Sequence, residues 1–325
     1  MRGEAMLEPC AVMSGTVGYL APEGFLDELR TELGRAGAAV RAQHGRLLLT
    51  DGPAIRAAWA QDVWHDPREL PAPSIKQAAG HLKALQRNWA LLPPERHYRR
   101  ARLIAAQLPH VSFKPLAFPQ APPRAPLGGW TLLQPELMLA APTTASPFPH
   151  GEVAFVEDRT TPPNRAYLKL WEALTVVDVR PQPGELCLDL GAAPGGWTWV
   201  LQMLGARVIA VDKAPLDPAI ARLPGVEARR DSAFGLRPQH FQAVDWLCSD
   251  VVCYPARLLE LVRRWLDAGR VRNFVCTLKF QGATDFDTQD AFAAIPGSRL
   301  MHLAHNKHEL TWVNLEAERA AAGGA

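Results

Sequence analysis

Long apolar runs and patterned cysteines are both missing from this sequence of 325 residues. Its five cysteines are scattered without a CxxC pair, which favours free thiols in a reducing cytoplasm over a disulfide framework. No stretch of about 18 apolar residues occurs, so we expect no membrane span and no membrane partner. Residues 1–14 lack the apolar core of a secretory signal and are expected to be a flexible leader.

A large excess of charge is missing as well. The formal net charge is +2, with 35 basic and 33 acidic residues, so any nucleic-acid surface must be local. At about 100–200 residues per domain, the length predicts two domains.

Common ligand-binding motifs are also absent. The chain has no G-x-G-x-x-G fingerprint, which argues against a nicotinamide dehydrogenase, and no G-x-x-x-x-G-K-[ST] phosphate loop. No cluster of His, Cys and acidic residues has metal-ligand spacing. We interpret "HNKH", which contains His305 and His308, as a turn, and we expect no metal.

Residues 15–150 are expected to form an α+β module that ends in a proline-rich linker. The segments "TVGYLAP", "EGFLDELRTELGRAG" and "RLLLTDG" predict a strand, an amphipathic helix and a second strand. Residues 74–108 are predicted to be helical, with the helix running through "IKQAAGHLKALQRNWALL" and broken at Pro93. Prolines between 115 and 163 interrupt regular structure and leave room for short strands in "WTLLQPELMLAAPT" and "EVAFVED".

Basic side chains gather in the helical part of this module, where Trp89 and Tyr98 are interleaved and Glu95 is the single acid between residues 76 and 102. Basic residues with aromatic neighbours suit phosphate contact and base stacking, although a solvated helix face fits the charge pattern equally well. The candidate RNA-binding residues are Lys83, Arg87, Arg96, Arg99 and Arg100.

From residue 185 onward, apolar strands alternate with helices. Strands are predicted in "ELCLDL", "ARVIAVD", "GVEARRD", "AVDWLCSD" and "VRNFVCTLKF", and helices between them, such as "ARLLELVRRWLD". This alternation indicates a doubly wound, mostly parallel α/β sheet with helices on both faces. "RLMHLAHNKHELTWVNL" adds two strands joined by a turn, which suggests an antiparallel edge. We place this domain at residues 151–318, followed by a flexible tail at 319–325.

The stretch "CLDLGAAPGGWT" at residues 187–198 carries most of the functional information. A buried strand ends there, glycines turn the chain and allow close backbone approach, and a helix begins, which favours a polar ligand at the strand end. Asp212 ends the next strand, where an acid can accept hydrogen bonds from ribose hydroxyls, and Asp231 is placed to reach an adenine amino group. The candidate cofactor-binding residues from this pattern are Gly191, Gly195, Gly196, Asp212 and Asp231, and the resemblance of the loop to a known family adds Ala193, Pro194, Trp197 and Asp250.

This pattern resembles the class I S-adenosylmethionine (SAM)-dependent methyltransferases, and "DLGAAPGGW" is similar to the FtsJ-like ribose 2′-O-methyltransferases. The resemblance implies a Rossmann-like, mostly parallel seven-stranded sheet and a Lys–Asp–Lys–Glu catalytic tetrad. The matching positions are Lys169, Asp250, Lys279 and Glu309, the last three at intervals of 29 and 30 residues. From the helix alone, Lys169 would instead form an exposed ion pair with Glu172, three residues on.

The segment "TTASPFPHGEVAFVEDRTTPPNRAYLKLWEAL" resembles the large-subunit rRNA methyltransferase M family. That resemblance implies 2′-O-methylation of a cytidine in 23S rRNA and a THUMP-related N-terminal region. A single site on a large RNA needs only one copy of the protein, so we expect a monomer. Ala166 stands where the family has a serine. In this interpretation Lys279 is the general base, Lys169 steadies the developing alkoxide, Asp250 orients Lys279, and Glu309 holds a lysine and the target ribose.

Three alternatives remain beside this interpretation. An amino-group methyltransferase would carry an Asn/Asp-Pro-Pro-Tyr/Phe turn, and this chain has "SDVVCYP" at that position. Cytosine C5 methylation would need a cysteine nucleophile, and Cys253 and Cys276 fit buried thiols better. A non-catalytic SAM- and RNA-binding assembly factor would keep the fold without the activity.

Overall fold

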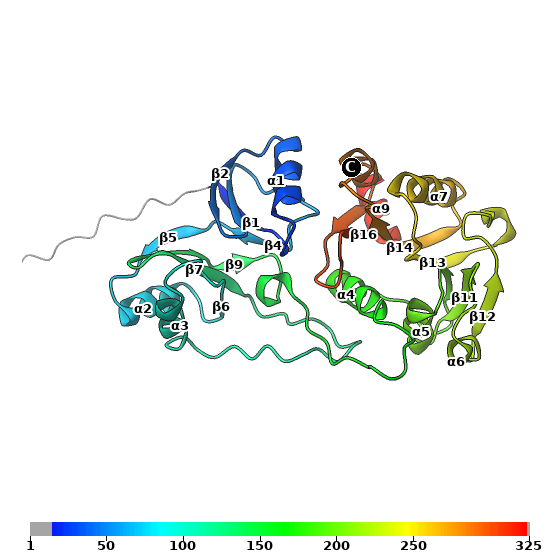
Figure 1. Ribbon diagram of the computed structural model, residues 1–325, viewed down its shortest axis with the longest axis horizontal. Helices are drawn as coiled ribbons and strands as arrows, with labels where there is room; N and C mark the ends of the chain where they lie inside the picture. The colour runs from blue at the N-terminus through cyan, green and yellow to red at the C-terminus, as the bar shows by residue number, and fades with distance from the viewer. Residues whose placement is uncertain (1–14, 324–325) are drawn as a thin grey trace, which may run out of the picture. The chain divides into compact units, whose positions relative to one another are not determined.

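The computed structural model describes residues 15–323, and two compact units divide them (Figure 1). The first unit holds the described residues up to 114 together with 123–153, and the second holds 115–122 and the residues from 154 onward. Residues 115–122 join the second unit because Leu116 forms an isolated parallel bridge with Phe155 and Phe118 stacks on Trp171 at 4.9 Å between ring centroids. The predicted leader at residues 1–14 lies outside the described residues.

The first unit begins with a five-stranded antiparallel sheet of order β2-β3-β1-β4-β9. Helix α1, Leu26–Arg35, buries Leu29 and Leu33 as its spacing predicts. The strands are β1 Thr16–Leu20, β2 Val40–His44, β3 Leu47–Asp51, β4 Asp62–His65 and β9 Thr143–Thr144.

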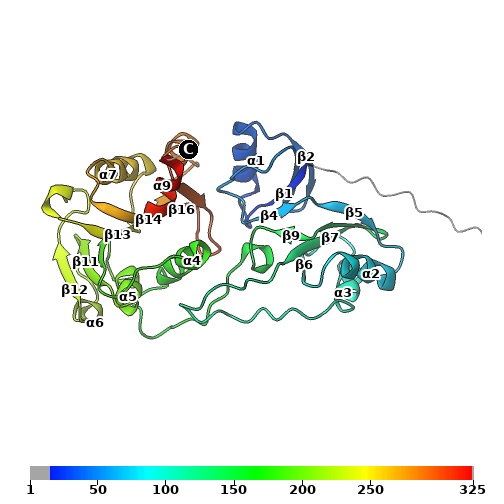
Figure 2. The ribbon, with the colours of Figure 1, turned by 180° about the vertical axis from the view of Figure 1, so that it is seen from behind.

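A four-stranded sheet of order β5-β8-β7-β6 completes the first unit, and helices α2 and α3 pack against each other beside it (Figures 1 and 2). Its core includes the fully buried Trp130, Leu82 and Ile104. The elements are β5 Arg68–Pro71, α2 Ile75–Leu85, β6 Trp89–Leu91, α3 Tyr98–Ala105, β7 Gly128–Gln134, β8 Leu137–Ala141 and the short 3-10 turn η1 Pro149–Gly151.

The prediction of one helix through residue 92 is wrong. Helix α2 ends at Leu85, and Trp89 begins strand β6, which pairs in parallel with β7. The indole N–H of Trp89 donates to the carbonyls of Leu82 and Gln86 at 3.1 and 3.0 Å. In a longer helix, these carbonyls at the end of α2 would instead accept from backbone N–H groups of the next turn. "EVAFVED" is also no strand, since it pairs only through the bridge at Phe155.

The second unit is built on a seven-stranded sheet of order β12-β11-β10-β13-β14-β16-β15, as the alternating pattern and the family resemblance predict. The strands from β12 to β14 in this order run parallel, and β16 lies antiparallel between β14 and β15. The strands are β10 Leu186–Leu190, β11 Arg207–Asp212, β12 Val226–Arg230, β13 Val244–Ser249, β14 Val271–Lys279, β15 Ser298–Met301 and β16 Glu309–Asn314.

Helices cover both faces of this sheet, with α4 and α5 packed together on one face and α7 on the other (Figures 1 and 2). None of the helices within residues 15–323 is long and apolar enough to cross a membrane. The helices are α4 Tyr167–Val177, α5 Gly196–Met203, α6 Pro218–Ala221, η2 Pro238–His240, α7 Pro255–Asp267, α8 Phe286–Ala293 and α9 Glu316–Gly323.

Two expectations about the ends of these helices are corrected. Residues 319–323 are helical rather than a flexible tail, because Arg319 donates to the carbonyls of Arg272 at 2.6 Å and Val271 at 3.4 Å; residues 324 and 325 lie outside the described part. Helix α4 begins two residues after the sequence suggests, with Ala166 at its N-cap and Asn164 Oδ1 accepting from the Ala166 N–H at 3.1 Å.

Candidate active site

Four predicted tetrad side chains from four separate elements meet at one edge of the large sheet. Lys169 Nζ lies 2.8 Å from Asp250 Oδ1 and 3.0 Å from Glu309 Oε1. Lys279 Nζ lies 3.0 Å from the same Asp250 Oδ1 and also donates to the Asp250 backbone carbonyl. The arrangement is a connected network in which Asp250 contacts both lysines.

The strand order explains why these distant residues are neighbours. Asp250 follows β13 and Lys279 ends β14, so both stand at the carboxyl edge of adjacent parallel strands. Strand β16 runs the other way, and its first residue, Glu309, pairs with Lys279 in the register. Helix α4 then directs Lys169 inward over the same edge, away from the exposed ion pair with Glu172 that local spacing suggests.

Burial and opposite charge set the electrostatics of this network. The side chains of Lys169, Asp250, Lys279 and Glu309 are 11%, 16%, 18% and 9% exposed, and their formal charges cancel. Burial alone lowers the pKa of Lys169, but the charges of Asp250 and Glu309 outweigh it, so that its pKa is raised. Lys169 therefore keeps its proton and acts as a fixed positive charge.

The glycine loop after β10 has no room for side chains at three positions. A Cβ on Gly191, where φ is +80°, would lie 2.7 Å from the Cα of Val251, and one on Gly195, where φ is +119°, would lie 2.8 Å from Ile220 Cγ2. A Cβ on Gly196 would overlap the side-chain oxygen of Asn164. Close packing of backbone against its neighbours, and not flexibility, therefore requires these glycines.

The other predicted cofactor residues surround this loop. Asp212 Oδ2 accepts from the N–H of Ala193 at 3.0 Å, which ties the end of β11 to the loop that contains Pro194. Asp231 is exposed beside it, and its N–H donates to the Asp212 carbonyl at 3.1 Å. Trp197 is buried, and its indole N–H donates to the Ala166 carbonyl at 2.9 Å. Its ring nitrogen thus fixes the start of α4.

A buried acid beneath the loop was not among the predicted site residues. Asp189 in β10 accepts from the Thr198 hydroxyl at 2.6 Å through Oδ2, while its Oδ1 is buried without a hydrogen-bond partner among the described residues. Burial, together with the nearby charges of Asp250 and Asp212, raises the pKa of Asp189 to about 7. The available sequence signal for an acid beneath the glycine loop was the position of Asp189, two residues before Gly191.

A pocket of about 550 Å³ opens beside the tetrad. Lys169, Lys279 and Glu309 line it together with His305 and Lys307, which sequence reasoning assigned to a turn without a function. The sequence signal that could have placed His305 and Lys307 in the pocket was their position shortly before Glu309.

The predicted RNA-binding residues of the first unit are more dispersed. Lys83 on α2, Arg87 after it, and Arg96 and Arg99 near α3 are exposed. Arg100 is half-buried and donates to the Ala72 carbonyl at 2.7 Å, which gives it a structural role.

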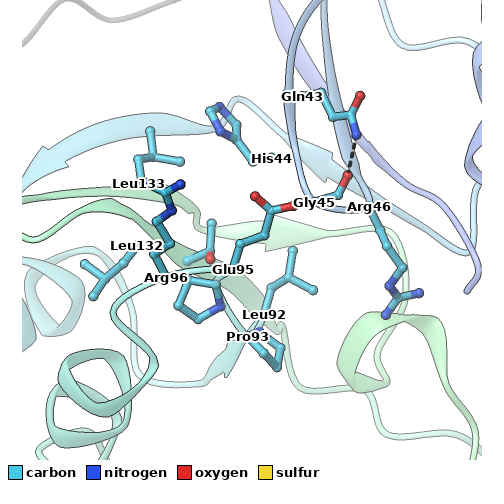
Figure 3. A pocket seen from close by; sticks show the side chains of 12 residues that line it. Gln43, His44, Gly45, Arg46, Leu92, Pro93, Glu95, Arg96, Leu132 and Leu133 are labelled. Carbon is cyan, nitrogen blue, oxygen red and sulfur yellow. Dashed lines mark hydrogen bonds between the residues drawn. The ribbon is translucent and has the colours of Figure 1, made fainter.

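Of these basic residues, Arg96 lines a pocket of about 370 Å³ in the first unit (Figure 3). The β2–β3 turn at His44 and Gly45 forms one wall, and Glu95 and the apolar Leu132 form others (Figure 3). Acidic and basic groups are thus mixed in this pocket.

The thiols are unsuited to nucleophilic catalysis. Burial raises the pKa of Cys253 and of Cys276, and a thiol that stays protonated is a weak nucleophile. This disfavours cytosine C5 methylation. Within residues 15–323, no three His, Cys, Asp or Glu side chains come together in a way that could hold a metal ion.

Comparison with known proteins finds similarity over most of this site. The family model described as FtsJ-like methyltransferase matches residues 162–280. The Ribosomal RNA large subunit methyltransferase M of Halorhodospira halophila is 41% identical over 166 residues, which cover 49% of this chain and 48% of the relative. Its namesake in Alkalilimnicola ehrlichii is 36% identical over 198 residues, which cover 57% of this chain and 53% of the relative.

The chain therefore spans about half the length of the curated relatives that it matches. A crystal structure of a ribosomal RNA methyltransferase from Plasmodium falciparum is 16% identical with a TM-score of 0.37 and covers 47% of this chain and 96% of its own, a similarity too weak to bear on function. The family match includes the glycine loop, Lys169, Asp250 and Lys279. Over residues 162–280 the chain is therefore similar to the FtsJ-like methyltransferases.

Proposed function

We propose that the protein transfers the methyl group of SAM to a ribose 2′-hydroxyl of large-subunit ribosomal RNA, with a cytidine of 23S rRNA as the target. The observation that carries this proposal is the network of Lys169, Asp250, Lys279 and Glu309 beside a glycine loop. A ribose hydroxyl needs a base and a stabilised oxyanion, and this network contains groups that can supply both.

The chemistry assigns a role to each member. Lys279 in its neutral amine form takes the proton of the 2′-hydroxyl as the oxygen attacks. Lys169 remains charged and stabilises the negative charge that develops on that oxygen. Asp250 orients Lys279 through its carboxylate and backbone carbonyl, and Glu309 holds Lys169 in place.

The residues around the glycine loop fit SAM. SAM supplies an electrophilic methyl group on a positively charged sulfonium, so that the C–O bond forms as the C–S bond breaks and a neutral thioether is left. The carboxylates of Asp212, Asp231 and Asp250 stand at this edge, where negative charge suits a cation. Gly191 and Gly195 let the backbone approach the cofactor closely.

The RNA substrate is proposed from the curated relatives, whose printed names give ribosomal RNA of the large subunit as the molecule they methylate. The exposed Lys83, Arg87, Arg96 and Arg99 of the first unit support it, because arginine and lysine are the usual phosphate contacts. We propose that the first unit is a THUMP-related RNA-binding module, that the second unit is the catalytic domain, and that the protein acts as a cytoplasmic monomer without a metal.

The test uses labelled SAM and 23S rRNA from a strain that lacks the protein. Wild type is compared with Lys279→Ala and with Lys114→Ala, an exposed lysine outside the site. We expect label at an alkali-resistant ribose with wild type and Lys114→Ala, and a loss of at least about 100-fold in kcat with Lys279→Ala, as removal of a general base predicts.

Other outcomes would contradict the proposal in distinct ways. Label on a base would overturn the tetrad assignment, and full activity of Lys279→Ala would remove that residue as the base. SAM binding without any transfer to rRNA would favour the non-catalytic assembly factor.

A further inference from the structure

The pocket beside the tetrad has an unbalanced charge. Glu309 is the one carboxylate among the pocket-lining residues in the described part of the chain, and it is bound to Lys169. Lys307 also lines the pocket, is exposed, and forms no ion pair with the described residues. His305 lines the pocket as well, and the proposed chemistry uses neither His305 nor Lys307. A lining with this excess of basic groups suits an anion.

His305 and Lys307 belong to the segment between β15 and β16, residues 302–308, which we call the 302–308 loop. Helix α4 holds this loop through Glu172, one turn beyond Lys169 and only 1% exposed. The Glu172 carboxylate accepts from the N–H groups of Ala304 and His305 at 2.8 and 3.0 Å and pairs with His305 Nδ1 at 2.6 Å. The element that supplies Lys169 thus also fixes the loop.

Contacts inside the loop fix it further. The buried Asn306 amide donates to the Glu309 carbonyl and to the Thr311 hydroxyl, both at 3.1 Å. His302 Nε2 lies 3.0 Å from the Lys307 carbonyl oxygen. The His305 ring packs against Phe155 at 5.8 Å between centroids. A loop with this many contacts is already arranged before any substrate arrives, which lowers the entropy lost on binding.

The contact with Glu172 also orients the imidazole of His305. Its Nδ1 proton is directed to a carboxylate, so Nε2 is the nitrogen left for a ligand, and no described residue forms a hydrogen bond with Nε2. The side chain is 20% exposed, so one part of the ring still reaches the pocket. This is how a histidine is held when its second nitrogen serves another molecule.

From these contacts we infer that the 302–308 loop is a phosphate-binding loop, in which His305 and Lys307 hold the phosphodiester next to the target ribose. The inference rests on the proposed ribose methylation. In RNA the 2′-hydroxyl is vicinal to the carbon that carries the 3′-phosphate, so a ribose placed at Lys279 brings a phosphate to the neighbouring wall of the pocket. Lys307 supplies a permanent positive charge there, and His305 supplies an Nε2 in a fixed position, which donates to the phosphate when the ring carries both protons.

The experiment measures RNA binding and turnover separately in the full chain. The dissociation constant for a 23S rRNA fragment is measured with S-adenosylhomocysteine bound, and KM and kcat for the same RNA are measured with SAM. The variants are His305→Asn, whose amide keeps a donor at the position of Nδ1 and removes Nε2, and Lys307→Gln. His308→Gln is the matched control, because His308 lies in the same loop but faces the Thr284 hydroxyl at 2.8 Å and does not line the pocket.

We expect both test variants to raise the dissociation constant and KM for RNA about ten-fold, the effect of one charge-assisted hydrogen bond. kcat, affinity for SAM and the melting temperature should stay at the wild-type values, and His308→Gln should match wild type throughout. Lys307→Gln should also lower the salt dependence of binding by about 0.7 in the log–log slope, as loss of one phosphate contact on a single strand predicts.

Unchanged RNA affinity in both test variants would overturn the inference, as would an equal loss in His308→Gln. Lost affinity with an unchanged salt slope in Lys307→Gln would replace phosphate with a base as the ligand. Because binding is measured without turnover, a wild-type protein that binds RNA but transfers no methyl group would contradict the proposed function and not the loop.

Discussion

Gly191 is the residue at which the glycine loop has the least room beside a backbone atom. Its φ of +80° strains any side chain, and a Cβ would lie 2.7 Å from the Cα of Val251, which cannot rotate away. We expect Gly191→Ala to move the loop relative to β13 and to weaken SAM binding at least about ten-fold, with a cost in stability of roughly 1–3 kcal/mol. Calorimetric titration with SAM and urea unfolding measure the two effects.

Gly184 gives the matched control for this substitution. Its φ of +85° is nearly the same, yet nothing lies within 4 Å of the Cβ that would be added. Gly184→Ala should therefore show the strain in unfolding while SAM affinity stays at the wild-type value. Equal SAM affinity in both variants would show that the close approach to Val251 has no part in forming the cofactor site.

Individual residues also mark the limit of local sequence reasoning. Spacing along α4 offers Glu172 as the partner of Lys169, but the structure pairs Lys169 with Asp250, which is 81 positions away. The resemblance to FtsJ-like proteins predicted that Lys169 and Asp250 lie together, because it implies the arrangement of the strands in the whole sheet. No such resemblance covered His305, whose partner Glu172 is 133 positions away, so its place in the pocket was missed.

At the scale of elements, α4 and the 302–308 loop are joined chiefly through one carboxylate. Glu172→Ala would leave the N–H groups of Ala304 and His305 without their acceptor, at a cost of about 1–3 kcal/mol for each group that stays buried. We expect faster hydrogen exchange in residues 302–308, while β10 and β11 exchange as in wild type. Exchange measured by mass spectrometry tests this.

Glu172→Gln tests the same prediction with a smaller chemical change. Its amide oxygen can still accept from one N–H, so exchange in the loop should be intermediate between wild type and Glu172→Ala. Identical exchange in all three proteins would mean that Asn306 and β16 hold the loop without α4.

Elements of the second unit were easier to predict than those of the first for a physical reason. Strands of a parallel sheet covered on both faces are largely apolar runs, such as residues 208–211 of β11, and helices separate them. Strands β4 and β5 are only four residues long and β6 only three. Segments this short cannot be told from helix or loop by their sequence pattern alone, because the strands that they pair with decide their structure. The end of α2 depends on Trp89, whose role appears only in the folded chain.

At the scale of the whole molecule, each unit buries one carboxyl group with a strongly raised pKa. Burial raises the pKa to about 7 for Asp62 in the first unit and for Asp189 in the second. Above the ordinary value of 3.8, the folded chain therefore binds more protons than the unfolded chain. The free energy of unfolding should fall as pH rises from about 4 to about 7, by an amount on the order of a few kcal/mol per group.

The substitutions Asp62→Asn and Asp189→Asn test this, because each removes one titrating group and keeps an acceptor oxygen. Urea unfolding between pH 4 and pH 8 should show a smaller fall in stability with each single variant and the smallest fall in the double variant. Each single variant serves as the control for the other. A pH dependence parallel to wild type in all three would contradict the assignment of these carboxyl groups as neutral in the folded chain.

The position of β16 has a consequence for the order of events during folding. This strand is the last of the described strands in the chain, yet it inserts between β14 and β15 and supplies Glu309. A chain that has built the sheet from β12 to β14 already carries Lys169, Asp250 and Lys279, with two positive charges against one negative. The proposed site is therefore incomplete until the final strand has joined the sheet and brought Glu309 to Lys169.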